Sequence, residues 1–307
     1  MNGDVTSALT GLSLVAPTPF DGDEEVAFDQ IGGLVAWAIA RGVSALTVTG
    51  TSGEAFRLSD KERLAVVKEF CSAAAGQLPV IAGAGHLSTV TAARLGQDLA
   101  ATGAAAILMP PPPVGACSAD TLVAHFDSVA TAIDAPVILQ DDPINLGITL
   151  PTQLVCDIAE RHDNVAHAKL EELPSPPKIR SIVALSQGRV RCLGGSGGVY
   201  ALEELAAGAS GIMTGFCYPE VLIAALTAFR EHDMDKARTL GDMSAALARI
   251  ESMPRVALSL RKHLYVERGA IRSAVLRAPG VVADPWLLEL ASSELKRVDQ
   301  TWAAYQR

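Results

Sequence analysis

The sequence predicts an α/β fold: a (β/α)8 TIM barrel with a C-terminal all-helical extension. Short apolar runs alternate with helical patterns eight times within about 230 residues, the count and length of a closed parallel barrel. The first run ends in Pro17-Thr18-Pro19, whereas an open dinucleotide-binding sheet has a glycine-rich turn there. Beyond residue 231 only helical patterns remain. We therefore expect a barrel over residues 1–232, carrying the active site, and a helical region over residues 233–307.

The first four strand–helix units are defined by short apolar runs and by helix-capping residues. The segment Ser59-Asp60-Lys61-Glu62 has the spacing of a capping box, Ser88 is a further N-cap, and Gly42 fits a C-terminal cap. We expect strands at residues 12–16, 45–49, 79–82 and 105–109, and helices at residues 26–41, 59–75, 88–102 and 119–133.

The remaining four units follow the same alternation. One helix carries prolines in its first turn, where a missing N–H costs little. We expect strands at residues 136–140, 165–169, 190–193 and 211–214, and helices at residues 152–161, 176–186, 199–207 and 219–231. The helical region should contain helices at residues 235–250, 254–266 and 285–305.

Composition excludes several classes of protein. A net charge of −9 argues against a nucleic-acid partner, because phosphate binding needs a basic face. No uncharged apolar run reaches the roughly 18 residues of a membrane span, and residues 1–9 lack the basic start of a secretory leader. The five cysteines are dispersed and form no C-x-x-C pair, which is typical of free thiols in a reducing cytoplasm. We expect a cytoplasmic protein with neither nucleic acid nor membrane as a partner.

The sixth predicted strand ends in Lys169, whose neighbours are apolar. Alternate side chains of a strand share a face, so His167, Lys169 and Glu171 point the same way, with His167 packed in the barrel wall. Desolvation lowers the pKa of an amine, and a neutral amine attacks a ketone to form a Schiff base. The alternative is a lysine at a strand end whose ammonium group reaches water.

The predicted strand ends bring polar residues together at the barrel mouth, where barrel proteins carry their chemistry. Thr51, Ser52 and the peptide N–H groups of residues 50–53 face Lys169 across this mouth. This arrangement suits a small carboxylate held while the amine attacks the adjacent ketone. The other strand-end residues are His86, residues 140–145, residues 194–198 and Thr214.

Several segments along nearly the whole chain resemble the dihydrodipicolinate synthase and N-acetylneuraminate lyase family of class I, Schiff-base aldolases. They are Pro17-Thr18-Pro19-Phe20, Gly50-Thr51-Ser52-Gly53-Glu54, Pro79-Val80-Ile81-Ala82-Gly83-Ala84-Gly85, Ala166-His167-Ala168-Lys169-Leu170-Glu171 and Gly208-Ala209-Ser210-Gly211. The resemblance implies that Lys169 forms a Schiff base with pyruvate or another 2-keto acid, and that Thr51 and Ser52 bind its carboxylate or pass protons. Further expected substrate contacts are Gly53, Gly195, Ser196 and Met213.

The resemblance also implies a homo-oligomer, a dimer or tetramer. No cofactor and no metal are expected, because the protonated imine does the polarising that a metal would otherwise do.

The chain departs from the family pattern at three positions. The family usually has a tyrosine at the end of the fifth strand, where this chain has Gln140, and an amide cannot titrate. The second tyrosine of the synthases, after the fourth strand, is replaced by prolines 110–113, and their substrate-binding arginine falls at Asn145. These losses argue against true dihydrodipicolinate synthase activity.

Other groups are candidates for the missing acid and base. Asp142 should point the same way as Gln140, and Glu171 the same way as Lys169, so either carboxylate is placed for proton transfer. His86 is a third candidate, because imidazole titrates near neutral pH. The alternative for each of these residues is a purely structural role at a loop or strand end. We expect Glu54 to be structural, with its carboxylate accepting N–H bonds around its own loop.

The glycine-rich turn at residues 194–198 allows two interpretations. Such a turn often holds a phosphate in barrel proteins, but it can also form a flat wall beside an imine. No lysine or arginine lies within it, so we favour the wall.

The sequence thus predicts a Schiff-base lyase or aldolase acting on pyruvate or a 2-keto-3-deoxy acid. The alternatives are a 2-keto-3-deoxy sugar acid dehydratase, and a non-catalytic family member that binds keto acids. A tight Lys169–Glu171 ion pair that left no room for a ligand would argue against all of them. The second substrate is expected to depend on the loops at residues 110–115 and 141–147.

Overall fold

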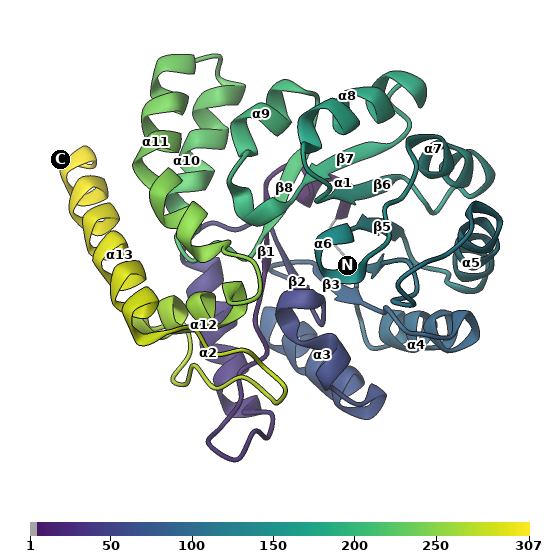
Figure 1. Cartoon of the computed structure of the whole chain (residues 1–307), viewed down its shortest axis with the longest axis horizontal. Coiled ribbons are helices and arrows are strands. Elements are labelled where there is room, and N and C mark those ends of the chain that lie inside the picture. The colour runs from purple at the N-terminus through teal and green to yellow at the C-terminus, as the bar shows by residue number, and fades with distance from the viewer. Residues whose placement is uncertain (1–4) are drawn as a thin grey trace.

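Eight parallel strands close into a barrel in chain order, with β8 pairing back to β1 (Figure 1). The computed structural model describes residues 5–307. The strands are β1 (Leu12–Val15), β2 (Ala45–Val48), β3 (Val80–Gly83), β4 (Ala106–Met109), β5 (Val137–Asp141), β6 (His167–Leu170), β7 (Arg191–Gly194) and β8 (Gly211–Thr214). The predicted (β/α)8 TIM barrel is confirmed.

A ring of helices surrounds the strands (Figure 1). The helices are α2 (Ile31–Ile39), α3 (Asp60–Ala74), α4 (Thr89–Ala101), α5 (Ala119–Ala132), α7 (Thr152–Arg161), α8 (Ser175–Leu185), α9 (Ala201–Ala206) and α10 (Pro219–Arg230). Ser59 caps α3 in a complete capping box with Glu62, and Ser88 caps α4, as predicted. These local signals place most of the boundaries within two residues.

Three local features differ from the prediction. The helix expected at residues 26–41 starts later, because Val26 pairs antiparallel with Phe20 and a 3-10 turn precedes α2. Two short helices, α1 (Val5–Ala8) and α6 (Pro143–Leu146), were not predicted. The first four residues of segment 1–9, where no leader was expected, lie outside the described range.

The barrel interior is filled by side chains from alternate strand positions. Its apolar cluster includes Val15, Ala45, Ile81, Leu108, Ile138, Leu193 and Met213, with Val5 and Leu9 of the α1 segment packed in the same cluster. Strand register sets Lys169 beside both Gln140 and Leu193, and His167 beside Ile138. The buried His167 therefore lies in the barrel wall, as expected. Lys169 lies one inward-facing position closer to the C-terminal rim.

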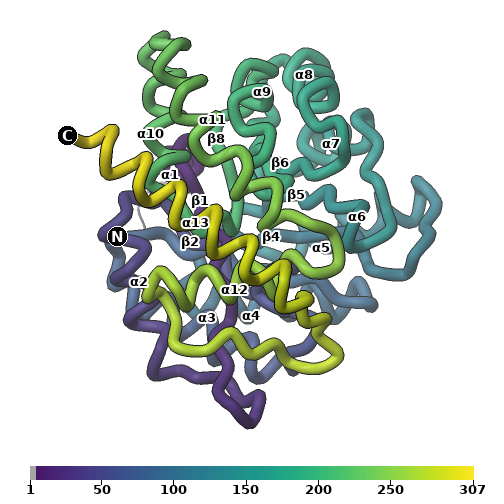
Figure 2. The backbone as a smooth tube through the Cα atoms, turned by 60° about the vertical axis from the view of Figure 1, so that its left-hand side comes forward, coloured from purple at the N-terminus to yellow at the C-terminus, as the bar shows by residue number. Residues whose placement is uncertain are grey.

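The chain ends in three further helices, α11 (Met234–Glu251), α12 (Ala257–Glu267) and α13 (Pro285–Tyr305). α11 packs against α10, and α13 lies on the outside against α11 and α12 (Figure 2). α12 begins at Ala257 instead of residue 254, because the preceding Arg255 has a left-handed φ of 73°. Among residues 5–307, no helix combines the length and the apolar character that a membrane span requires.

Candidate active site

Lys169, Glu171 and Gln140 meet at the C-terminal rim of β5 and β6. The Nζ atom of Lys169 lies 2.8 Å from Oε2 of Glu171, and Gln140 Nε2 donates a hydrogen bond to the same oxygen over 3.2 Å. Lys169 is 5% exposed, so the pair forms in a largely desolvated place. The structure thus brings three predicted residues together. It also forms the Lys169–Glu171 ion pair, which would argue against a keto-acid site if it left no room for a ligand.

The glycine-rich turn after β7 forms a backbone surface against Glu171. A Cβ atom on Gly195 would lie 2.3 Å from Cγ of Glu171, so only glycine leaves room for this side chain. Ser196 has a left-handed φ of 42°, and its hydroxyl points to the Glu171 carbonyl over 3.5 Å. The turn therefore holds the Glu171 side chain close to Lys169, which fits the wall interpretation.

Asp142 lies beside the hydroxyl group of Thr51, a residue of the loop that follows β2. Thr51 Oγ1 donates to Asp142 Oδ2 over 3.3 Å, and Asn145 Nδ2 donates to both carboxylate oxygens, over 2.9 and 3.0 Å. Burial raises the pKa of Asp142 to about 6; the negative charge of Glu171 adds to this rise and Lys169 opposes it. Asn145 therefore holds a carboxylate of the protein itself.

The loop that follows β2 begins with Thr49, a residue with a strained backbone conformation. Thr49 has a φ of 49°, an unfavourable value for a β-branched residue, and it directly precedes Gly50. The N–H of Gly53 donates to the Gly50 carbonyl over 3.0 Å, and the Gly53 carbonyl accepts from Thr18 over 2.6 Å. Both peptide groups of Gly53 are thus used within the protein.

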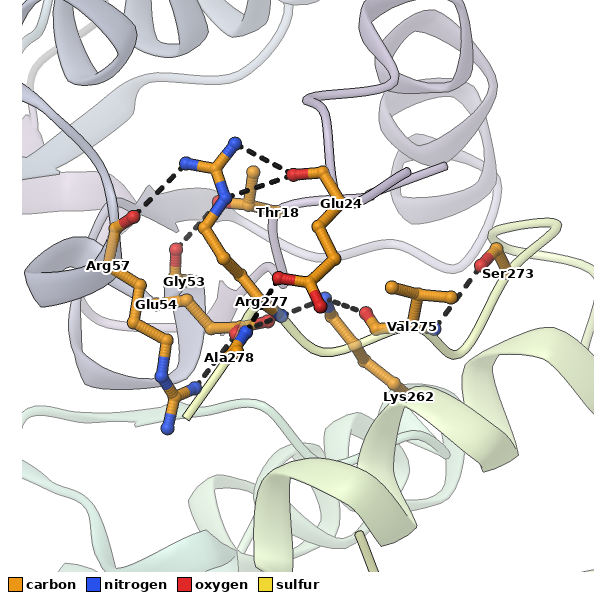
Figure 3. A network of polar contacts seen from close by, with 10 residues as sticks. All are labelled: Thr18, Glu24, Gly53, Glu54, Arg57, Lys262, Ser273, Val275, Arg277 and Ala278. Atoms are coloured by element: carbon orange, nitrogen blue, oxygen red, sulfur yellow. Dashed lines mark hydrogen bonds and ion pairs between the residues drawn. The ribbon is translucent and has the colours of Figure 1, made fainter. Parts of the chain in front are cut away.

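Glu54 is the centre of a buried polar network (Figure 3). Its carboxylate accepts bonds from Lys262 Nζ over 2.6 Å, from Arg57 Nη1 over 2.8 Å and from the N–H of Arg277 over 3.1 Å. The expected structural role is supported, but the single N–H partner comes from a segment far along the chain. Sequence reasoning missed Lys262 and Arg277, because no local pattern joins residues more than 200 positions apart.

The remaining predicted residues lie in separate surroundings. Nδ1 of His86 accepts the N–H of Ser88 over 3.1 Å, a local contact within its own turn. Met213 is fully buried in the barrel interior. Among residues 5–307, no three or more His, Cys, Asp or Glu side chains are grouped so as to hold a metal ion.

Another buried acid, Glu204, lies behind the glycine turn and was not predicted. Ser175 Oγ donates to Glu204 Oε1 over 2.6 Å, and a Cβ on Gly194 would lie 1.9 Å from Oε2. Burial raises the pKa of Glu204 to about 8, so this carboxyl holds its proton at neutral pH. The two successive glycines thus separate Glu204 from Glu171.

The protein is a closed (β/α)8 barrel. Its candidate site contains the Lys169–Glu171 pair and nearby hydroxyl groups at the C-terminal rim. Comparison with known proteins gives the family. The chain belongs to the dihydrodipicolinate synthetase family, whose model matches residues 8–284.

Individual relatives agree with this assignment. A 4-hydroxy-tetrahydrodipicolinate synthase from Thermoanaerobacter sp. (strain X514) is 31% identical over 160 residues, covering 52% of this chain and 53% of the relative, so the match spans about half of either protein. The same-named protein from Geobacter metallireducens is 31% identical over 225 residues, covering 73% and 76%. The crystal structure of dihydrodipicolinate synthase from Rhodopseudomonas palustris superposes with a TM-score of 0.88 at 28% identity, covering 95% of this chain and 98% of that one.

Proposed function

We propose that this chain is a Schiff-base-forming lyase of the class I aldolase type that acts on pyruvate or a 2-keto-3-deoxy acid. The observation that carries the proposal is the buried Lys169 at the end of β6, with Nζ held 2.8 Å from the Glu171 carboxylate. Its relatives are named as synthases that belong to the same family. A lysine in this place supplies the nucleophile, and its partner supplies the proton acceptor that a nucleophilic amine needs.

The proposed reaction uses the groups around Lys169 in sequence. Glu171 takes a proton from the Lys169 ammonium, and the freed amine attacks the ketone carbon. Glu171 then protonates the resulting alkoxide. Asp142, through the Thr51 hydroxyl, takes a proton from nitrogen and returns it to the hydroxyl group, which leaves as water. The C–N bond formed replaces the C–O bond broken, and the product is a protonated imine that withdraws electrons from the neighbouring carbon.

Substrate orientation follows from the β2 loop and the opposite wall. We assign the carboxylate to the Ser52 hydroxyl and to the N–H groups of Thr51 and Ser52, which lie on the loop after β2. The backbone of Gly195 and Ser196 forms the wall beside the imine, and Met213 forms the apolar floor. Gln140 takes the tyrosine position as a hydrogen-bond donor to Glu171.

The proposal is tested by incubating the protein with pyruvate, reducing with borohydride and weighing the product by mass spectrometry. The wild-type chain should gain the mass of one reduced pyruvate adduct, mapped to Lys169. The Lys169→Ala variant should gain none, because it lacks the amine that we assign as the nucleophile. An adduct of equal yield in Lys169→Ala, or none in the wild type, would refute the Schiff-base assignment.

Schiff-base formation should depend on the ionisation of Asp142. With the pKa of Asp142 raised to about 6 by burial, its ionised fraction rises from about a tenth at pH 5 to about nine tenths at pH 7. The rate of pyruvate trapping should therefore increase with pH with a midpoint near 6, since only the ionised form accepts a proton. Asp142→Asn should be slower at pH 7 and lack this midpoint. An unchanged pH profile in Asp142→Asn would assign the titration to another group.

Turnover separates the alternative functions. Asn145, where the resemblance places the arginine of the synthases, is bonded to Asp142, so we place true dihydrodipicolinate synthase activity below an aldolase or a 2-keto-3-deoxy acid dehydratase. An adduct without turnover on any 2-keto acid would support a non-catalytic keto-acid-binding protein. Full synthase activity would show that the lost tyrosines matter less than we argue.

We further propose a cytoplasmic homo-oligomer, a dimer or tetramer, with residues 1–232 as the catalytic barrel and residues 233–307 as a helical region that completes the site. All five cysteines, which lie within the described residues, are free thiols, in keeping with a reducing compartment.

A further inference from the structure

One side chain of the C-terminal helical region reaches the barrel mouth. Arg261 of α12 is 7% exposed, and its Nη1 atom donates to Ser52 Oγ over 2.8 Å. The side chain crosses the rim beside Gly215, directly after β8. A Cβ atom there would lie 2.9 Å from Cδ of Arg261 and 3.0 Å from the Val15 carbonyl, so the crossing requires glycine.

The guanidinium group of Arg261 also forms an ion pair with Glu251. Its Nε atom donates to Oε1 of the fully buried Glu251 over 2.7 Å, and Oε2 of Glu251 accepts the N–H of Cys217 over 2.9 Å. Burial alone would lower the pKa of Arg261, but the carboxylate of Glu251 outweighs it and the net pKa lies above the usual value. Arg261 is thus a fixed cation, oriented by Glu251, with one N–H group directed at Ser52.

This contact determines which hydrogen bonds the Ser52 hydroxyl can make. A guanidinium nitrogen only donates hydrogen bonds, so Ser52 Oγ must be the acceptor. The Ser52 O–H therefore remains to be donated to another acceptor. A hydrogen bond donated by a cation also polarises the hydroxyl and strengthens the bond that the hydroxyl donates.

We propose that Arg261 is a positioning residue for the substrate carboxylate: it holds Ser52 with its proton directed at the carboxylate of a 2-keto acid. The inference rests on the proposed function and extends it, because it gives the helical region a part in substrate affinity. Arg261 acts through Ser52, so the two residues should behave as one unit, and their effect should require a charged carboxylate on the ligand.

A double-mutant cycle with Arg261→Met and Ser52→Ala tests this coupling. The measured quantity is the pyruvate concentration that gives half-maximal borohydride trapping, together with the maximal trapping rate. Each single variant should raise the half-maximal concentration about tenfold, as expected for one lost hydrogen bond to a charged group. The double variant should be no more than about twofold worse than either single variant, and the maximal rate should change little, since Lys169 and Glu171 are untouched.

Two controls separate positioning from general damage. Methyl pyruvate presents the same ketone with its carboxylate masked as an ester, so its trapping should be the same in Arg261→Met and the wild type. Arg268→Met is the matched protein control: Arg268 caps α12, and its partners Glu220 and the Cys217 carbonyl lie outside the 51–54 segment. It should leave the pyruvate concentration for half-maximal trapping unchanged. The inference would be overturned if the double variant raised the half-maximal pyruvate concentration by the product of the two single effects. It would also be overturned if Arg261→Met weakened the trapping of methyl pyruvate as much as that of pyruvate.

A non-covalent measurement distinguishes this inference from the proposed function. Pyruvate should raise the melting temperature of Lys169→Ala, which cannot form the imine, and the rise should disappear in Lys169→Ala/Arg261→Met. If the wild type traps no pyruvate but this loss is seen, the Schiff-base proposal fails and the Arg261 inference stands. If the wild type traps pyruvate and Arg261→Met has the same half-maximal pyruvate concentration, the Schiff-base proposal stands and the Arg261 inference fails. Should Arg261→Met fail to fold, Glu251→Gln replaces it and should shift the half-maximal concentration in the same direction.

Discussion

Replacing Glu171 with glutamine should slow the trapping of pyruvate by about 100-fold at pH 7, the lower end of what a positioned general base contributes. Glutamine keeps the size and the packing against Gly195 but cannot take the proton from Lys169, whose Nζ lies 2.8 Å from the carboxylate. The measurement is a quenched time course of adduct formation at saturating pyruvate.

Glu172→Gln is the matched control for this prediction. Glu172 is the next residue, but it pairs with Lys178 over 2.6 Å, so trapping in this variant should match that of the wild type. Faster trapping in Glu171→Gln would mean that the ion pair restrains the amine. Glu171 would then be an inhibitory partner of Lys169, contrary to its assignment as the base.

The Lys262→Met variant should lose about 3 kcal/mol of unfolding free energy, the range found when one partner of a buried ion pair is removed. Both side chains of the Lys262–Glu54 pair are fully buried, with 2.6 Å between Nζ and Oε1. Methionine fills the space of the stem but leaves the Glu54 carboxylate with one cation fewer. A urea titration followed by circular dichroism measures the change.

Arg57→Met is the comparison for this second prediction. Arg57 pairs with the same carboxylate, but its side chain is 27% exposed, so its loss should cost about 1 kcal/mol or less. If Lys262→Met unfolds at the same urea concentration as the wild type, the network of Figure 3 does not anchor the helical region to the barrel.

Features that depend on interactions between residues close in the sequence were predicted correctly. The capping box at Ser59 and the period of the apolar runs predicted the barrel, because both act within a few residues. Strand alternation also placed Gln140 with Glu171 at the mouth, since the side-chain period of two is a property of the strand itself. The helix α6 was missed although Asp142-Pro143 is an N-cap followed by proline at N1, a usable signal.

Contacts between residues far apart in the sequence could not be predicted from such local patterns. Arg261 and Lys262 lie within a helical run and look there like ordinary polar positions, yet their partners Ser52 and Glu54 lie 209 and 208 residues away. The ion pair of Lys169 with Glu171 was named only as a possible arrangement. Desolvation was inferred correctly from the apolar neighbours, but the side-chain conformation that brings Glu171 to Nζ is set by the close approach of Gly195.

The two neighbouring cations of α12 fix the rotational phase of that helix. Successive helical residues point about 100° apart, so Arg261 and Lys262 reach two different residues of the β2 loop from one turn. Inserting or deleting a single residue early in α12 would swing both away from their targets. Length variation among homologous chains should therefore be found in the connecting segments at residues 252–256 and 279–284, leaving α12 itself at constant length.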